Sequence, residues 1–470
     1  MEIVQYIGYS IYLITIIGTI LVVISENRNP IRTLAWVLVL IFIPAIGIVL
    51  FYFFGQNNRK IRSISSKYKE WKGIRHSEAL IAEHKSNKPK QFISLSKLLS
   101  QVNDSLLLRG SKVEIITSGP RKFEALLSDI EKATHHIHME YFIFNNDETG
   151  RKVKQALMKK ASEGVSVRFL YDNVANIGIP AGFYNEMKKA GVEVCPFMKI
   201  RFASFKSRVN YRNHRKVVVI DGTIGYIGGM NIGDEYAANP NWRDTHLRIQ
   251  GRGVYALQIN FLKDWFSTLQ KEVGSDDGSY FPDCDIYTDN LLQVAVGGPN
   301  TQWPNLLQAT ISAVISSKKY LYIQTPYFLP TDSLFEALQI AALSGVDVQL
   351  MVSRKSDSSY LDPAIRSYYS DLLRSGLRIF EHQTQFIHAK TMVADDYLSV
   401  IGSANMDFRS FESNFEINCY LYDQELAIQN KEIFLKDREG CKEVLLEEWE
   451  KRSRLKRVFE SLMRLFAPLM

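Results

Sequence analysis

Charged residues are almost absent from the first part of the chain, and this pattern predicts two apolar helices. No charged side chain occurs from Ile3 to Ser25, and none occurs again from Thr33 to Asn58. Each stretch exceeds the roughly 20 residues that a helix needs to cross the hydrocarbon core of a bilayer. The polar segment between them contains Pro30, which favours a turn. We therefore expect residues 1–58 to form an all-α transmembrane hairpin of two helices.

Basic residues around this hairpin predict its orientation. Residues 59–90 contain ten Lys or Arg and three Glu, whereas the turn between the two apolar stretches contains Arg28 and Arg32. Because Lys and Arg near a span favour the cytoplasmic side, we expect a two-span protein of the cell membrane with a cytoplasmic catalytic part. A cleaved signal peptide is the alternative for the first stretch, but no basic segment precedes it. Residues 59–110 are expected to be a basic juxtamembrane linker.

Beyond the linker, short apolar runs alternate with longer amphipathic stretches, and the order of these segments occurs twice. For example, Ile137–Phe142 is similar to Ile323–Phe328. Equivalent segments lie 174–186 residues apart, which indicates a duplicated domain and not a solenoid of short repeats. Strands that alternate with helices predict an α/β fold. We therefore expect two pseudo-symmetric α/β sandwich halves, 111–275 and 276–450, that share one active site.

Each half contains the same series of polar residues at the same spacing. A Lys follows two residues after a His, an Asp seven residues after it, and an Asn seventeen residues after it. On a strand, residues two apart share one face, so each His and Lys should project together. Two copies at equivalent points of a duplicated domain indicate a catalytic site, although the turn position of each Asp suits a capping role at least as well. The expected catalytic residues are His214, Lys216, Asp221, His388, Lys390 and Asp395.

This set of side chains suits the cleavage of a phosphodiester. The reaction needs a nucleophile, an acid for the leaving oxygen, and cations on the non-bridging oxygens. One imidazole can attack phosphorus, and the other can exchange a proton with the alcohol. We expect Asn231, Ser403 and Asn405 to donate hydrogen bonds to the phosphoryl oxygens. The first half has Gly229 where the second has Ser403, so a hydroxyl contact is expected from the second half only.

A nucleophilic imidazole must be held in one tautomer, usually by a carboxylate on its other nitrogen. Asp244 lies 30 residues after His214, and Glu416 lies 28 residues after His388. These two acids are the candidates for the orienting carboxylates.

The paired H-x-K-x4-D motifs resemble those of the phospholipase D superfamily and, within it, the bacterial cardiolipin synthases. Asn210–Lys216, Trp242–His246 and Gln324–Phe328 add to the resemblance, which extends over essentially the whole chain. It implies two phospholipase-D-like halves and a phosphatidyltransferase that converts two phosphatidylglycerol molecules into cardiolipin and glycerol, without a metal or other cofactor. It also implies that His214 is the nucleophile and His388 the acid and base, an order that the residues alone leave open. A hydrolytic phospholipase D, which would release phosphatidic acid, is the alternative.

The net charge of +7 is concentrated in a few segments. Residues 199–216 contain seven basic residues, among them Arg212 and Arg215, and no acid. Such a stretch can bind nucleic acid, but beside a phosphodiester motif on a membrane-tethered chain an anionic lipid headgroup is the simpler ligand. We expect phosphatidylglycerol in an anionic bilayer as the partner, and no nucleic acid. The oligomeric state stays open.

Two further segments complete the expectations. Residues 451–470 contain six basic residues and one acid, with apolar residues three or four positions apart, which predicts a basic amphipathic helix. Such a helix can lie on an anionic membrane or pack its apolar face on the domain, and we expect the second. His135, His136 and His138 form a cluster without a second group of ligands, so no metal site is expected.

Overall fold

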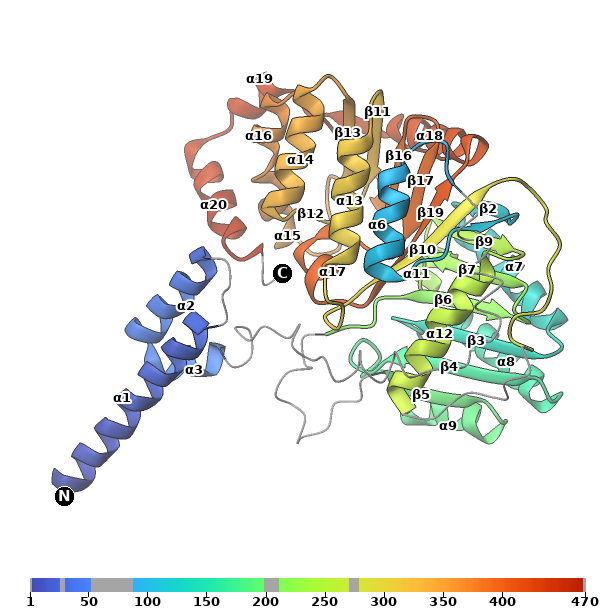
Figure 1. The fold of residues 1–470 in the computed structure, drawn as a ribbon, viewed down its shortest axis with the longest axis horizontal. Helices are drawn as coiled ribbons and strands as arrows, with labels where there is room; N and C mark the ends of the chain where they lie inside the picture. The colour runs from blue at the N-terminus through green and yellow to red at the C-terminus, as the bar shows by residue number, and fades with distance from the viewer. Residues whose placement is uncertain (1, 26–29, 52–87, 198–210, 270–278, 468–470) are drawn as a thin grey trace. The chain divides into compact units, whose positions relative to one another are not determined.

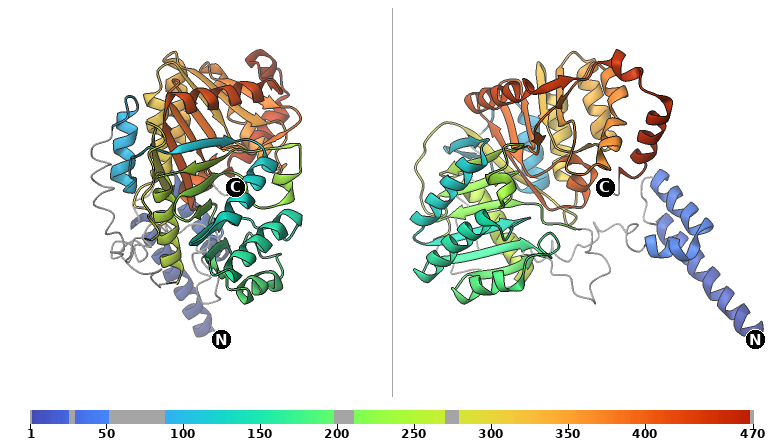
Figure 2. Two further views of the ribbon diagram at one scale, coloured as in Figure 1. Left: turned by 90° about the vertical axis from the view of Figure 1, so that its right-hand side faces the viewer. Right: turned by 180° about the vertical axis from the view of Figure 1, so that it is seen from behind.

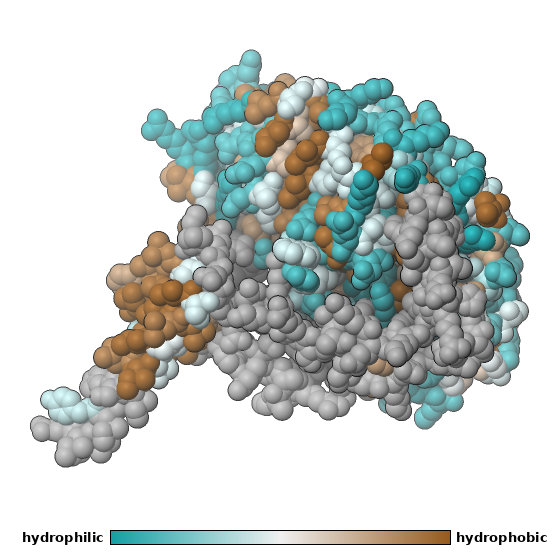
Figure 3. All heavy atoms as spheres, viewed as in Figure 1, coloured by the Kyte–Doolittle hydropathy of each residue, from teal (hydrophilic) through white to brown (hydrophobic). Residues whose placement is uncertain are grey.

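The computed structural model describes residues 2–25, 30–51, 88–197, 211–269 and 279–467. These residues belong to two units, and the first contains the N-terminal helices α1 (Glu2–Ser25), α2 (Pro30–Phe42) and α3 (Pro44–Leu50). Its described side chains are mostly apolar, and many are exposed, including Leu13 at 58% and Phe42 at 77% (Figure 3). Val23, Leu40 and Phe51 form a small core between the helices.

The predicted second apolar helix is divided in two. Helix α2 ends at Phe42 and α3 begins at Pro44, whose ring suits the first position of a helix because that position needs no N–H donor. Within the described parts of the chain, no helix is both long and apolar enough to cross a membrane. Most of the predicted linker, residues 59–87, lies outside the described residues.

The second unit contains the duplicated α/β fold, and the strand order shows the duplication directly (Figure 1). In the described residues, the first sheet has the order β2-β9-β7-β6-β3-β4-β5. The second contains the order β10-β19-β17-β16-β11-β13-β14, flanked by β1 (Leu108–Arg109) and β20 (Cys441–Glu443). The first strands are β2 (Lys112–Ile116), β3 (His136–Tyr141), β4 (Ser166–Asp172), β5 (Glu193–Phe197), β6 (Lys216–Ile220), β7 (Ile224–Gly228) and β9 (His246–Gln250). Their counterparts are β10 (Leu291–Gly297), β11 (Tyr320–Gln324), β13 (Asp347–Ser353), β14 (Arg378–His382), β16 (Thr391–Ala394), β17 (Leu398–Gly402) and β19 (Glu416–Tyr422).

Both sheets are mixed, as the alternation of strands and helices predicts. Strands β3, β4 and β5 are parallel, and so are β11, β13 and β14, because helices connect them. The other pairings in the two seven-strand orders are antiparallel. Strand β6 reads Lys-Val-Val-Val-Ile and is buried throughout, since β-branched residues suit a strand that is covered on both faces.

Helices cover both faces of each sheet (Figure 2). In the first half, α7 (Gly119–Lys132), α8 (Glu148–Ser162) and α9 (Ala181–Lys189) pack on one face, and α12 (Val254–Leu269) packs on the other. In the second half, α13 (Asn305–Ser316), α14 (Asp332–Leu343), α15 (Leu361–Arg366) and α16 (Tyr369–Arg374) share a core on one face, and α18 (Gln424–Arg438) covers the other.

The end of the predicted linker is part of the fold instead. Helix α6 (Ile93–Asn103) buries Leu95 and Leu99 in the core of the second half and packs against α13. Strand β1 (Leu108–Arg109) pairs with β10 at the edge of the second sheet. The expectation that residues 59–110 form a linker is therefore wrong for residues 93–109. The apolar spacing of this short helix does not reveal that it belongs to the half that follows later in the chain.

One core joins the two halves. It contains Ile227 and Leu247 from the first sheet, Ile401 and Ile417 from the second, and Phe261 from α12. Because these side chains are fully buried against one another, the halves form one body and can position groups of a common site.

Candidate active site

Short backbone pairings between the halves hold both histidines. The N–H of His214 donates to the carbonyl of Phe415 at 2.9 Å, so a first-half histidine is held by the second half. The N–H of His388 donates to the carbonyl of Arg243 at 2.7 Å, where β15 (Phe386–Ile387) pairs with β8 (Trp242–Arg243). Each half therefore fixes the histidine segment of the other.

The orienting carboxylates cross between the halves as well. The Nδ1 atom of His214 lies 2.9 Å from Oε2 of Glu416, and Nδ1 of His388 lies 2.6 Å from Oδ2 of Asp244. Both predicted carboxylates thus contact an imidazole, but each serves the histidine of the other half. A carboxylate that accepts a hydrogen bond from Nδ1–H keeps the proton on Nδ1 and leaves the lone pair of Nε2 free. This is the tautomer that a nucleophilic imidazole needs.

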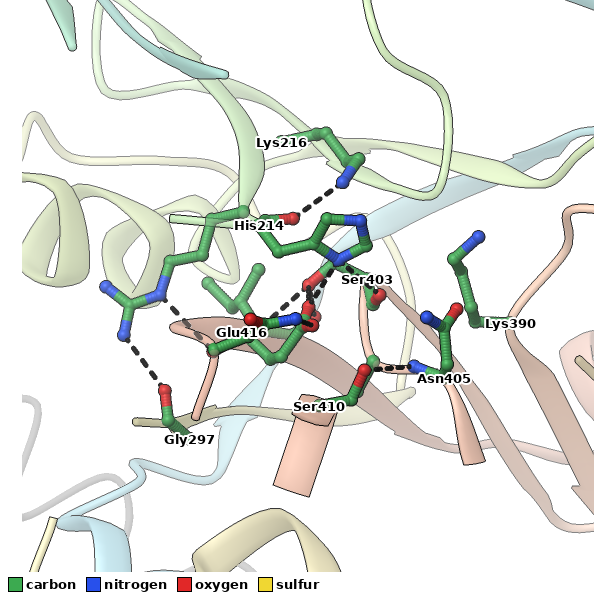
Figure 4. A network of polar contacts seen from close by, with 12 residues as sticks. His214, Lys216, Gly297, Lys390, Ser403, Asn405, Ser410 and Glu416 are labelled. Atoms are coloured by element: carbon green, nitrogen blue, oxygen red, sulfur yellow. Dashed lines mark hydrogen bonds and ion pairs between the residues drawn. The ribbon is translucent and has the colours of Figure 1, made fainter. Parts of the chain in front are cut away.

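Lys216 and Lys390 lie near the imidazole of His214 (Figure 4). Lys216 and Lys390 are buried, and each ammonium donates to the backbone carbonyl of its own histidine. Burial and, to a smaller extent, the charge of Lys390 lower the pKa of Lys216 to about 7, so the two lysines share one electrostatic site. Burial lowers the pKa of Lys390 to about 8.

Burial also decides the charge of the imidazoles. It lowers the pKa of His214 to about 4 and that of His388 to about 3, although the adjacent carboxylates act in the opposite direction. Burial would raise the pKa values of Glu416 and Asp244, but the neighbouring histidines and lysines hold both below their ordinary values. At neutral pH the site therefore contains neutral imidazoles, ionised carboxylates and lysines close to their titration range. This distribution of charge suits the binding of a phosphodiester anion beside the two lysines.

The side chains that were predicted to donate hydrogen bonds to phosphate donate them to other protein groups in this structure. The hydroxyl of Ser403 donates its hydrogen bond to Oε2 of Glu416, so the expected contact of this hydroxyl with phosphate is not supported. The Nδ2 atom of Asn231 donates to the Tyr236 hydroxyl, and that of Asn405 donates to Asp407 at 3.0 Å. These side chains therefore fix the surroundings of the imidazoles.

The difference between Gly229 and Ser403 has a steric reason. A Cβ atom on Gly229 would lie 2.1 Å from Oδ1 of Asp244, well inside van der Waals contact. The first half needs glycine at this position because its orienting carboxylate lies against the backbone. In the second half the equivalent position carries a hydroxyl that binds the other carboxylate, so the two dyads are not identical.

Asp221 and Asp395, predicted among the catalytic residues, lie at the other end of the strands from the histidines. Asp221 follows β6 and accepts backbone hydrogen bonds from Thr134, His135 and His136, at 2.8–2.9 Å. Asp395 likewise accepts three, at 2.7–3.0 Å, from residues 318–320. This geometry favours a capping role for both over proton transfer, because strands of five and four residues separate them from the imidazoles.

The two arginines predicted to bind the headgroup, Arg212 and Arg215, have different surroundings. Arg215 is buried and forms an ion pair with Asp264 of α12, while its Nε donates to the carbonyl of Glu416 at 3.2 Å. It braces the backbone that carries Glu416 and does not point toward a ligand, which corrects the prediction. Arg212 is half-buried and donates to the carbonyl of Tyr211. Residues 198–210, the rest of the basic stretch, lie outside the described residues.

Sequence reasoning missed the aromatic walls around the imidazoles. The Phe142 ring lies edge-on to His214, with centroids 4.7 Å apart, and the Trp242 and Phe386 rings lie 5.3 and 5.7 Å from His388. Aromatic rings exclude water and so add to the burial that lowers the pKa of both histidines. Phe142 directly follows the buried strand β3, and Trp242 precedes Asp244 by two residues, but no spacing rule marks either as lining the site.

Comparisons with known proteins agree with this geometry. The family model described as cardiolipin synthase, phospholipase-D-like domain, matches residues 126–265 and 311–438, one match in each half. A second model, the phospholipase D nuclease N-terminal domain, matches residues 10–56. The chain is 37% identical to the major cardiolipin synthase of Bacillus subtilis over 471 aligned residues, which cover 98% of both chains. It is 36% identical to cardiolipin synthases of Listeria monocytogenes over the full length of both chains.

A solved structure shows the same fold. Phosphatidylserine synthase from Haemophilus influenzae superimposes with a TM-score of 0.60 at 16% identity, covering 80% of this chain and 97% of that one. The likeness in structure establishes the mixed α/β fold, and the likeness in sequence establishes the family. The chain belongs to the cardiolipin synthase family of the phospholipase D superfamily.

Proposed function

We propose that this protein is a cardiolipin synthase that transfers a phosphatidyl group from one phosphatidylglycerol to another through a phospho-histidine intermediate. The observation that carries the proposal is the pair of crossed dyads, His214 with Glu416 and His388 with Asp244, beside two buried lysines. One imidazole acts as nucleophile and the other as acid and base. No cofactor takes part in any step of the proposed mechanism.

In the first step, Nε2 of His214 attacks the phosphorus of phosphatidylglycerol. The bond between phosphorus and the headgroup glycerol oxygen breaks, and His388 gives its Nε2 proton to that oxygen, so glycerol leaves. Asp244 accepts a hydrogen bond from the Nδ1–H of His388, and the bound phosphodiester anion favours the imidazolium that burial alone disfavours. Lys216 and Lys390 stabilise the charge on the non-bridging oxygens.

In the second step, the headgroup hydroxyl of another phosphatidylglycerol gives its proton to His388. Its oxygen bonds to phosphorus, the bond between phosphorus and His214 breaks, and cardiolipin is released. The aromatic rings of Phe142, Trp242 and Phe386 favour transfer to the second lipid over hydrolysis, because they keep water from the phospho-histidine.

The proposal includes attachment to the cell membrane. Two charge-free stretches, the exposed apolar side chains of α1–α3, and the ten basic residues at 59–90 support a two-span hairpin whose catalytic part lies in the cytoplasm. The partner is then an anionic bilayer that supplies phosphatidylglycerol, and nucleic acid is not a substrate. Protease treatment of sealed cells tests this orientation, since a cytoplasmic catalytic part must survive until the membrane is opened.

Product analysis tests the reaction itself. Vesicles of pure phosphatidylglycerol should yield cardiolipin and glycerol in equal amounts, whereas release of phosphatidic acid would identify a hydrolase. His214→Ala and His388→Ala should each abolish turnover, and His135→Ala, at an exposed histidine outside the site, is the matched control. Near-normal rates in either active-site variant would contradict the two-histidine mechanism.

A phosphatidyl donor with a good leaving group distinguishes the roles of the two histidines. Departure of a phenolate such as p-nitrophenolate needs no acid, so His388→Ala should accumulate enzyme that carries the phosphatidyl group on His214. His214→Ala should accumulate none. Peptide mass spectrometry locates the phosphate, and a label on His388 would reverse the assigned roles.

A further inference from the structure

Helix α20 (Arg454–Arg464) turns its apolar residues away from the protein. The structure contradicts the expectation that this face packs on the domain. Between 47% and 83% of each of six large apolar side chains is exposed on α20 and the turn after it. These six residues, here called the α20 apolar face, are Leu455, Val458, Phe459, Leu462, Leu465 and Phe466.

The opposite side of α20 fixes this orientation. Glu460 is buried and accepts a hydrogen bond from Arg452, and Ala467 is buried just beyond the helix. The Arg464 guanidinium lies 4.1 Å from the centroid of the Tyr368 ring. Ser453 caps the start of the helix by accepting from the N–H of Lys456. The α20 apolar face is therefore presented by a docked helix, and the exposure does not come from a loose chain end.

The exposed charges on α20 and in the turn before it have one sign. Lys451, Arg454, Lys456 and Arg457 are all exposed. The only acid between Lys451 and Met470 is Glu460, which is buried in its pair with Arg452. An apolar stripe bordered by cations, with no exposed acid, is the pattern of a helix that lies in the interface of an anionic membrane.

Helix α20 is also connected to the active-site edge of the second sheet. It packs on α15, which is the first helix after β13. The last residue of β13, Ser353, accepts a hydrogen bond at 2.7 Å from the N–H of Ile387, the neighbour of His388. A surface that holds α20 would therefore also hold the edge at which His388 lies.

We propose that the α20 apolar face docks on an anionic lipid bilayer and forms a second membrane contact, separate from the N-terminal helices. The apolar side chains enter the boundary between headgroups and acyl chains, and the exposed lysines and arginines contact lipid phosphates. This contact orients the catalytic body toward its lipid substrate. The inference rests on the proposed function only in taking the substrate to be an anionic membrane lipid.

Hydrogen exchange on the full chain tests the docking. The protein is placed in nanodiscs of phosphatidylglycerol, in nanodiscs of phosphatidylcholine, and in detergent micelles. Amides of residues 454–466 should exchange about tenfold more slowly in phosphatidylglycerol than in the other two, because only that surface offers both acyl chains and anionic charge. Equal exchange in all three overturns the proposal. Protection that appears without lipid and grows with protein concentration also overturns it, since a second copy of the chain would then be the occupant.

A matched pair of variants connects docking to activity. Phe459→Gln combined with Leu462→Gln removes two apolar anchors, while Ile315→Gln changes an apolar residue of α13 that is 58% exposed. The double variant should lose the exchange protection and about tenfold in kcat/KM on phosphatidylglycerol vesicles, and the control should lose neither. An unchanged double variant refutes the docking.

Failure of the two proposals can be told apart. Turnover of phosphatidylglycerol dispersed in mixed micelles does not need a bilayer, so wild type and both variants should be equally active there. Absence of cardiolipin in micelles with wild-type protein contradicts the proposed function, while protection of α20 still reports on docking. Full micellar activity without bilayer-dependent protection contradicts only the docking.

Discussion

Replacing Asp221 by Asn separates a capping role from a catalytic one. The Oδ1 atom of Asp221 accepts from the N–H groups of His135 and His136, and Oδ2 accepts from Thr134 N–H and its hydroxyl. Asp221 has φ +51°, a left-handed conformation that Asn adopts more readily than most residues. The change to Asn therefore alters hydrogen bonding without adding backbone strain.

The expected loss of stability follows from this geometry. With Oδ1 kept as the acceptor, the new NH2 group faces the N–H of Thr134, so one charge-assisted hydrogen bond is lost, at a cost of about 2 kcal/mol. Asp221→Ala loses all four hydrogen bonds and adds about 1 kcal/mol for the left-handed backbone. Its total should be about 4 kcal/mol, because the partly exposed donors regain hydrogen bonds to water. For a body of this size, 2 kcal/mol lowers Tm by about 2–3 °C.

The sign of the pH effect follows from the pKa of Asp221. Burial would raise this pKa, but hydrogen bonds from Thr134, His136 and His135 together hold it below its ordinary value. The stabilisation is therefore fully present above the unfolded-state pKa of about 4 and is lost as the pH falls through the lower, folded-state value. The gap in Tm between wild type and Asp221→Asn should close over that acidic range.

The assay combines thermal unfolding with turnover per folded molecule. Asp221→Asn should show a lower Tm and a kcat within about threefold of wild type, since a cap at the far end of β6 touches no reacting group. His214→Ala should show no turnover per folded molecule, because it removes the proposed nucleophile. An unchanged Tm with a kcat at least 100-fold lower for Asp221→Asn would refute the capping argument and restore a catalytic role.

Three further predictions concern the interior of the site. Gly229→Ser should lower kcat about 100-fold, because the Cβ atom of the new serine would displace Asp244. Activity equal to wild type would show that the backbone moves to make room for the serine. The profile of kcat/KM should fall as the pH rises through 7–8, because Lys216 and Lys390, with pKa values of about 7 and 8, lose the protons that attract the phosphodiester; a flat profile to pH 9.5 contradicts this. Lys122→Met should raise Tm, because the Lys122 ammonium is buried without a hydrogen-bond partner among the described residues; a lower Tm would show that the ammonium is satisfied in solution.

Local patterns predicted the parts of this protein that depend on local order. Residues two apart on a strand share a face, and a repeated spacing of the same residue types identifies equivalent positions, so His214 and His388 could be found together with their lysines. The strand order of the second sheet repeats that of the first for the same reason: duplicated sequences carry duplicated apolar runs.

Predictions that depended on packing were less successful. An amphipathic helix has an apolar face, but the sequence does not say whether protein or membrane covers it, and α20 exposes the face that was expected to be buried. Arg215 belongs to a basic stretch, yet its ion pair with Asp264 required a helix from a later part of the chain to lie beside it. Helix α6 was assigned to a linker because its partner, α13, is about 200 residues away.

The crossing of the dyads shows most clearly why packing was needed. Measured along the chain, Asp244 and Glu416 lie almost the same distance after the histidine of their own half, so spacing suggests an arrangement within each half. The fully buried Glu416 would be costly without a partner, and its partner is His214 of the other half. Joining the halves therefore buries each carboxylate and selects the imidazole tautomer in one event. Neither half alone has an oriented histidine, so the active site forms only when both halves are folded against each other.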